Sequence, residues 1–334
     1  MWKKWLALTL KTLVSGFLIG FLIQQVDLVA AKERALKVAP DMLALAILLM
    51  VVQVFIANFR WRVVLKALIN TMLPYFRTLR ILYISFFFNQ ALPSSVGGDA
   101  VRMVLGRRAG IPLGQAISSV FLDRVANLLA LVVIVACATP LFILHIAPNQ
   151  QQWIWVGLSV LVVVVMLGLV FLVALQRLPE KLHKWRLVRG LIGLAGDTQR
   201  VFLNPGHAVR ALGWSIVGFV NITVAVYFLA KGLQLNITLA DCMVLIPMVF
   251  LVTTLPISIA GWGVREGAMV AALGLIGVPS EGALVLSLLL GFISLAICLP
   301  GGLVWMMSSE KRTDIADAMS SLETDAATAD DGRQ

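Results

Sequence analysis

Long apolar runs alternate with short polar connections along most of the chain. A run of about 18 residues or more crosses a hydrocarbon core of about 30 Å as an α-helix, which rises ~1.5 Å per residue. The pattern therefore predicts an all-α polytopic membrane protein. The predicted full spans are residues 5–25, 41–59, 113–144, 153–175, 209–231 and 282–308.

Two further apolar segments are interrupted by proline and glycine. Residues 78–92 stop at Pro93, and residues 239–257 contain Pro256 just before a glycine-rich turn. A broken helix at membrane depth is tolerated where the freed backbone is buried in protein or lines a wet cavity. We therefore expect two re-entrant hairpins, at residues 77–106 and 239–276.

The two interruptions resemble one another in sequence. LPSSVGGDAVR (residues 92–102) aligns without gaps to LPISIAGWGVR (residues 255–265), with six identities in eleven positions. Coincidence between two turns rich in glycine and proline is the alternative explanation. Interrupted hydrophobic segments at matching places in the two halves of a chain are typical of the binding site of a transporter.

Positive charge in the loops predicts how these segments cross the membrane. Cytoplasmic loops are rich in Lys and Arg, and residues 176–208 contain six such residues. This loop is cytoplasmic only if residues 77–106 enter from the cytoplasm and return, and residues 239–276 enter from the outer face and return. The hairpins then form an inverted repeat whose tips meet near the midplane. Both termini and the loop 60–77 are cytoplasmic, and the basic loop 26–40 is an exception.

Composition narrows the class of protein further. The chain is 60% hydrophobic and 13% charged, which excludes a water-soluble fold. The net charge of +10 comes from bases in short loops, where they set topology and attract anionic lipid rather than nucleic acid. We expect an integral membrane domain at residues 1–308. Residues 309–334, in which acids outnumber bases, are expected to form a disordered cytoplasmic tail.

No metal or cofactor site is predicted. The three cysteines lie inside apolar runs without CxxC spacing, and the three histidines are scattered. A P-loop motif is also absent from the sequence, so ATP hydrolysis is not expected to drive any transport. The basic start of the chain is similar to a signal peptide, but Lys11 interrupts its apolar region and we expect a retained helix.

Six ionisable residues are expected in or near the bilayer. Each would cost roughly 2.5–3.5 kcal/mol if it faced lipid alone. They are therefore predicted to face the protein interior or a wet cavity. These residues are Asp99, Arg102, Asp123, Arg124, Arg265 and Glu266.

Two interpretations of this charged set remain open. The acids and arginines pair off and pin the broken helices together, or the arginines bind a phosphate-bearing headgroup in the bidentate geometry that guanidinium favours. Buried ion pairs seldom add net stability. We therefore expect Arg102 and Arg265, which lie close to glycines in the repeat, to bind phosphate, and Arg124 to pair with an acid. Asn89 is expected to satisfy freed carbonyls around Pro93, and Trp262 either lines a lipid path or fills a packing gap.

FFFNQALPSSVGGDAVR, the FLDR of residues 121–124 and LPISIAGWGVREG together resemble the flippase-like membrane family typified by the transmembrane region of lysylphosphatidylglycerol synthase. The resemblance covers roughly residues 5–308. It implies an integral inner-membrane protein that moves lipids or lipid-linked molecules between leaflets. The chain lacks the soluble aminoacyl-transferase domain of the full synthase, so lysyl transfer is not expected. The resemblance places function on Asn89, Gly98, Asp99, Arg102, Asp123, Arg124, Gly263, Arg265 and Glu266.

Three functions fit these features. The first is a flippase or transporter that binds an anionic headgroup of a membrane phospholipid or lipid-linked substrate. The second is a non-catalytic partner of a lipid-modifying enzyme. The third is an intramembrane transferase, for which paired carboxylates alone are weak support. The sequence favours the transporter, and assay of the purified protein in liposomes separates it from the non-catalytic partner.

Overall fold

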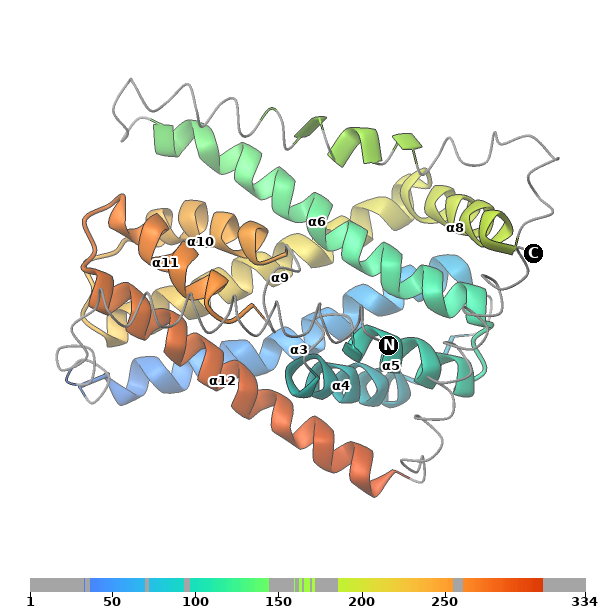
Figure 1. Cartoon of the computed structure of the whole chain (residues 1–334), viewed down its shortest axis with the longest axis horizontal. Helices are drawn as coiled ribbons and strands as arrows, with labels where there is room; N and C mark the ends of the chain where they lie inside the picture. Colours follow the sequence, from blue (N-terminus) through green and yellow to red (C-terminus); the bar gives the residue numbers. More distant parts are fainter. Residues whose placement is uncertain are drawn as a thin grey trace, which may run out of the picture.

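A computed structural model describes residues 33, 37–69, 72–92, 97–143, 186–254 and 261–308, with parts of 159–171. Its secondary structure is α-helical and contains no strand within this described part, which confirms the all-α fold class (Figure 1). The helices are α3 (Pro40–Leu68), α4 (Tyr75–Ala91), α5 (Gly97–Arg108), α6 (Leu113–Ile143), α8 (Arg186–Phe202), α9 (Pro205–Gly232), α10 (Leu239–Thr253), α11 (Val264–Gly274) and α12 (Ser280–Met307).

Four of the described helices, α3, α6, α9 and α12, are long and apolar enough to cross a membrane. They correspond to four of the six predicted spans. The predicted span 5–25 and the predicted tail 309–334 lie outside the described residues, and the predicted span 153–175 lies largely outside them. The chain is therefore a multi-pass membrane protein.

Helices α3 and α9 run antiparallel along much of their length. At one end the amide of Ala39 donates to the carbonyl of Gly232 at 2.9 Å. At the other end Ala211, early in α9, packs in one hydrophobic cluster with Val64 and Leu68, late in α3. The pair forms a continuous support against which the shorter helices pack.

Helices α4 and α5 form an antiparallel hairpin. Gly98 at the start of α5 lies against Asn89 near the end of α4, and Leu105 near the end of α5 shares a cluster with Ile81 of α4. The segments before and after this hairpin line one cavity of about 590 Å³, with Ala67, Leu68, Ile69 and Leu73 before it and Ala109, Gly110, Ile111, Pro112 and Gln115 after it. The α4–α5 hairpin therefore begins and ends on the same side of the protein.

Helices α10 and α11 form a second hairpin at the opposite end (Figure 1). Helix α10 begins at a capping box in which Thr238 and Asp241 satisfy each other's backbone amides. Helix α11 follows Gly261 and Gly263, whose φ angles of 82° and 86° are readily adopted only by glycine. Leu235, before this hairpin, contacts Gly282, after it. This hairpin also returns to its starting end.

Two predicted loops contain helix instead. The loop expected at 60–77 is shorter, because α3 continues to Leu68. The apolar run ends at Arg60, but Trp61, Val64 and Leu65 keep one face of the helix buried at helical spacing. The loop expected at 176–208 contains α8, an amphipathic helix that packs its apolar side on α3 and α6.

Each hairpin packs in its own hydrophobic cluster. One cluster joins α4 and α5 to the C-terminal half of α3, with Val304 and Trp305 of α12 beside it. The other joins α10 and α11 to the N-terminal halves of α3 and α12 and the C-terminal half of α9. Helices α3 and α12 are thus shared by both hairpins.

Candidate functional site

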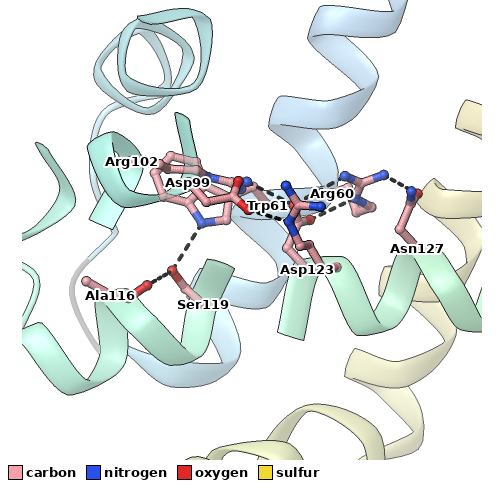
Figure 2. A network of polar contacts seen from close by, with 9 residues as sticks. Arg60, Trp61, Asp99, Arg102, Ala116, Ser119, Asp123 and Asn127 are labelled. Atoms are coloured by element: carbon pink, nitrogen blue, oxygen red, sulfur yellow. Dashed lines mark hydrogen bonds and ion pairs between the residues drawn. The ribbon is translucent and has the colours of Figure 1, made fainter. Parts of the chain in front are cut away.

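Asp123 on α6 lies at the centre of a buried ion network (Figure 2). Arg60 on α3 donates to it twice, from Nε to Oδ1 at 2.7 Å and from NH2 to Oδ2 at 3.2 Å. The remaining terminal nitrogen of Arg60 donates to Oδ1 of Asn127 at 2.6 Å, one turn further along α6. Arg60 is therefore held by two neighbouring side chains of one helix face.

Arg102 on α5 reaches the same carboxylate from the other side. Its NH1 donates to Oδ2 of Asp123 at 3.0 Å, and its guanidinium lies 4.1 Å from the ring centroid of Trp61. The Trp61 indole donates in turn to Ser119. Nε and NH2 of Arg102 are buried without a hydrogen-bond partner among the described residues. The Asp123 carboxylate therefore accepts hydrogen bonds from the guanidinium groups of both Arg60 and Arg102.

Asp99 and Arg124 form a second ion pair in the same region. Asp99 is buried in the first turn of α5, whereas more than half of the Arg124 side chain is exposed. The prediction that Arg124 pairs with an acid is therefore confirmed, with Asp99 of the hairpin as the observed partner. Together with the Arg102–Asp123 bond, this pair fixes α5 to α6.

Asn89 and Gly98 hold the two helices of the first hairpin together. Asn89 Oδ1 accepts a hydrogen bond from the Gly98 amide at 3.0 Å, so it satisfies a backbone donor at the start of α5. A Cβ on Gly98 would overlap the Ser85 carbonyl oxygen and the Asn89 side chain. Gly98 therefore allows α4 and α5 to approach closely, and the Asn89 hydrogen bond holds them together.

Glu266 is the centre of the polar contacts in the second hairpin. It accepts from the Gly263 amide at 2.6 Å, from Arg265 NH2 at 2.6 Å and from Ser287 of α12 at 3.0 Å. Its buried carboxylate therefore caps the start of α11 and holds Arg265 at the same time. A carboxylate in the first turn also complements the helix dipole.

Trp262 and Arg265 stack beside a glycine of α12. The Arg265 guanidinium lies 4.8 Å from the ring centroid of Trp262, which also contacts the ring of Phe292. A Cβ on Gly291 would overlap both Arg265 and Trp262. Trp262 therefore supports the guanidinium against α12, a role that the sequence pattern left open.

A cavity of about 300 Å³ lies between the two hairpins. Phe86 of α4, Phe250 of α10 and Arg265 of α11 all line it, so residues near the ends of both hairpins face the same space. Arg60 and Asn127 line it from the long helices, but Arg102 is absent from its lining. Of the predicted tips, residues 93–98 and 256–263, the parts 93–96 and 256–260 lie outside the described residues. The other described lining residues are Gln53, Ala57, Phe219, Ile222, Leu290 and Ser294.

Arg60 and Asn127 are site residues that the sequence pattern does not single out. Arg60 follows an apolar run, which indicates a cytoplasmic loop, although the buried positions continue at helical spacing for two more turns. Asn127 carries no charge, so the cost of burial does not mark it. Its position four residues after Asp123, on the same face of a helix, is the signal that would have found it.

The sequence matches the family described as Lysylphosphatidylglycerol synthase TM region over residues 8–302. The chain belongs to this family, as the resemblance predicted. It is also similar to a UPF0104 membrane protein of Methanothermobacter thermautotrophicus, with 26% identity over 296 residues, 79% of this chain and 82% of that protein. The chain is thus an integral membrane protein of a family related to lipid metabolism.

Proposed function

We propose that the protein is a transporter that moves an anionic lipid or lipid-linked molecule between the leaflets of a bacterial-type inner membrane. The observation that carries this proposal is the cavity between the hairpins, lined by guanidinium groups from two different elements. Arg60 belongs to a long helix and Arg265 to the second hairpin. A headgroup phosphate between them would contact both parts of the protein.

The hairpins supply the alternating access that such a transporter needs. We propose that both are re-entrant, with α4 and α5 open to the cytoplasm and α10 and α11 open to the outer face. Each returns to its starting end, and the connections at these ends lie at opposite ends of α3. Motion of either hairpin would open the shared cavity to one side, as in transporters built on inverted repeats.

The charge at the two ends supports this orientation. The end that carries the α3–α4 and α5–α6 connections bears many described basic residues: Arg62, Lys66, Arg77, Arg80, Arg107, Arg108, Arg200 and Arg210. The opposite end carries Lys37 and Lys231 beside Asp41, Asp241 and Glu281. By the positive-inside rule the first end is cytoplasmic, and with it both chain termini.

Transport is tested with the purified full chain in liposomes that contain fluorescent phospholipid in both leaflets. A membrane-impermeant reductant destroys fluorescence in the outer leaflet only, so transport is measured as loss beyond the half that empty liposomes lose. We expect protein-dependent loss that falls on replacement of Arg60 or Arg265 by Gln. Equal loss with the exposed-surface control Arg80→Gln and with Arg265→Gln would contradict the proposed site.

A further inference from the structure

We infer that the two hairpins open unequally: α10 and α11 form the gate that opens readily, whereas α4 and α5 are held against the long helices by ion pairs. This inference rests on the proposed function, because it assigns unequal roles to the two gates of the same transporter. It follows from a comparison of the two halves of the structure, whose helices match while their polar contacts differ.

The repeat covers four helices in each half and not the hairpins alone. The order of long helix, hairpin and long helix occurs first in α3 to α6 and again in α9 to α12. Each unit begins with a proline in the first turn of its long helix, Pro40 or Pro205. The last helix of each unit contains an internal proline, Pro140 or Pro300. The two halves can therefore be compared helix by helix.

Contacts between α3 and α9 relate the two units by a two-fold rotation. Gln53 and Gly218 each lie 13 residues after the proline that begins their helix, and a Cβ on Gly218 would lie 3.2 Å from Gln53 Nε2. Matched residues that contact each other are typical of a two-fold relationship, in which one surface faces itself. Both ends of the helix pair agree, because an alanine early in one helix packs with the end of the other: Ala211 with Val64 and Leu68, and Ala46 with Leu229 and Leu233.

The matched arginines of the two hairpins are held in different ways. Arg102 of α5 bonds Asp123 of α6 at 3.0 Å, so this ion pair joins the hairpin to a long helix. Arg265 of α11 bonds Glu266, the next residue of the same helix, at 2.6 Å. This second pair is bonded to α12 through the neutral hydroxyl of Ser287, at 3.0 Å from Glu266 and 3.2 Å from Arg265. The first arginine therefore attaches its hairpin by charge, and the second does not.

The first hairpin has further polar attachments. They reach three neighbouring long helices: Asp99 pairs with Arg124 of α6, Thr78 accepts from Arg62 of α3, and Tyr83 donates to the Ile297 carbonyl of α12. Among the described residues of the long helices, Ser287 is the polar group to which the second hairpin bonds. The two hairpins thus differ in how many bonds must break before they move.

Close packing differs in the same direction. A Cβ on Gly301 of α12 would lie 2.4 Å from the carbonyl oxygen of Tyr83, so the backbones of α12 and α4 are in close contact. The residue 163 positions earlier, at the offset of the repeat, is Ala138 of α6, which packs against the cluster of the second hairpin. Glycine allows helices to approach more closely than a residue with a side chain does. The first hairpin is therefore also the more closely packed.

Movement of the two hairpins has different electrostatic consequences. Movement of α5 away from α6 separates the Arg102–Asp123 pair, and separated charges are costly at membrane depth. Movement of α11 carries Arg265 and Glu266 together, so their charges stay paired. The second hairpin therefore opens at the lower cost. Because Arg265 lines the cavity, this movement exposes the cavity first at the end that we propose to be the outer face.

Hydrogen–deuterium exchange of the purified full chain in lipid nanodiscs tests the inference. Exchange of helical amides, corrected for the intrinsic rate of each sequence, measures local opening. We expect the amides of α10 and α11 to exchange about 10-fold faster, or more, than those of α4 and α5, the effect of one charge-assisted hydrogen bond. Equal protection of the two hairpins, or faster exchange in α4 and α5, would overturn the inference.

Asp99→Asn combined with Arg124→Gln tests the role of the ion pairs. The double variant removes one pair without leaving the Asp99 carboxylate charged and alone. We expect exchange in α4 and α5 to become about 10-fold faster, while exchange in α10 and α11 stays the same. Arg80→Gln, on the exposed side of α4, should change neither hairpin. Unchanged exchange of α4 and α5 in the double variant would overturn the assignment of their protection to ion pairs.

Thiol labelling separates this inference from the proposed function. Ser294→Cys places a thiol on the cavity wall, and a membrane-impermeant maleimide is added to either side of oriented vesicles. The labelled peptide is identified by mass spectrometry. We expect labelling about 10-fold faster from the outer face.

The other outcomes assign the failure. Faster labelling from the cytoplasm, together with faster exchange in α10 and α11, would overturn the proposed orientation and support unequal opening. Faster exchange in α10 and α11 with no transport of any lipid in liposomes would overturn the transporter and support unequal opening. Transport by a chain whose two hairpins exchange equally would overturn this inference and support the proposed function.

Discussion

Arg60 and Asp123 form a two-bond ion pair that joins α3 to α6, with nitrogen–oxygen distances of 2.7 and 3.2 Å. Arg60 lies eight residues before the end of α3 and Asp123 ten residues after the start of α6. At ~1.5 Å per residue both are therefore about 12–15 Å from the same end of the helices. An ion pair at this depth connects the cavity wall to the first hairpin, because Asp123 also binds Arg102.

Removal of Asp123 should cost more stability than removal of Arg60. Asp123→Asn leaves two buried guanidiniums without a carboxylate, whereas Arg60→Gln leaves Asp123 paired one to one with Arg102. Breaking a buried pair by loss of one partner costs ~3–5 kcal/mol. We expect a loss in that range for Asp123→Asn and a smaller one for Arg60→Gln, measured by unfolding in detergent. Arg80→Gln is the matched control, and an Asp123→Asn variant as stable as this control would contradict the network.

The Asp99–Arg124 pair should behave as a coupled unit. Arg124→Gln leaves the buried Asp99 carboxylate without this cation, and we expect a loss of about 1–3 kcal/mol because the partly exposed site is partly screened. Asp99→Asn in the same chain removes the stranded charge and should restore part of the loss. A double-mutant cycle measures this coupling. Strictly additive losses would show that the two side chains do not act together.

Close approach of α4 and α5 depends on Gly98. A methyl group at this position would meet the carbonyl oxygen of Ser85, which is fixed in a helix backbone. We expect Gly98→Ala to destabilise the protein by about 1–3 kcal/mol, as overpacking does. Gly114→Ala is the control, since Gly114 has no atom near its would-be Cβ. That variant should be unchanged or more stable, because alanine favours helix over glycine. Equal melting temperatures would contradict tight packing at Gly98.

Gly291 should matter for transport more than for stability. Its would-be Cβ meets the far end of the Arg265 side chain and the Trp262 ring rather than backbone, and Arg265 borders the cavity. Gly291→Ala should therefore shift the Arg265 guanidinium and lower transport, while Glu266 keeps its bonds to Gly263 and Ser287, so that the melting temperature falls less than in Asp123→Asn. Gly267→Ala on α11, where nothing lies close, serves as control. Full transport by Gly291→Ala would show that Arg265 need not occupy its observed position.

Much of this arrangement follows from the sequence, because the cost of polar groups in lipid limits the alternatives. Apolar length identifies α3, α6, α9 and α12, and the repeated Pro and Gly breaks identify both hairpins. The cost of burial singles out Asp99, Asp123 and Glu266 without any structure.

The partners of these acids could not be predicted in the same way. Pairing across 63 residues, as between Arg60 and Asp123, depends on how α3 packs on α6, and no local pattern encodes it. Arg60 also follows an apolar run directly, where a basic residue ordinarily marks a membrane boundary. Only the buried face that continues beyond it places this residue inside the protein.

Lysine variants distinguish the three arginines by role. Lysine keeps the charge but loses the forked geometry that binds phosphate at two points. Arg60 and Arg265 line the cavity, so Arg60→Lys and Arg265→Lys should lower transport about 10-fold or more, the effect of one lost charge-assisted bond. Arg102 is absent from the cavity lining and stacks on Trp61.

Arg102→Lys should accordingly reduce the melting temperature through the lost stacking, while transport per folded molecule changes less than in the other two variants. Melting temperature and liposome transport are measured on the same three preparations, with Arg80→Lys as a surface control. Because lysine retains the positive charge at each position, the comparison separates geometry from charge. Full activity of both Arg60→Lys and Arg265→Lys would exclude bidentate phosphate binding. If Arg102→Lys were the only variant to lose activity, the phosphate would bind near Arg102 and Asp123 and not in the cavity.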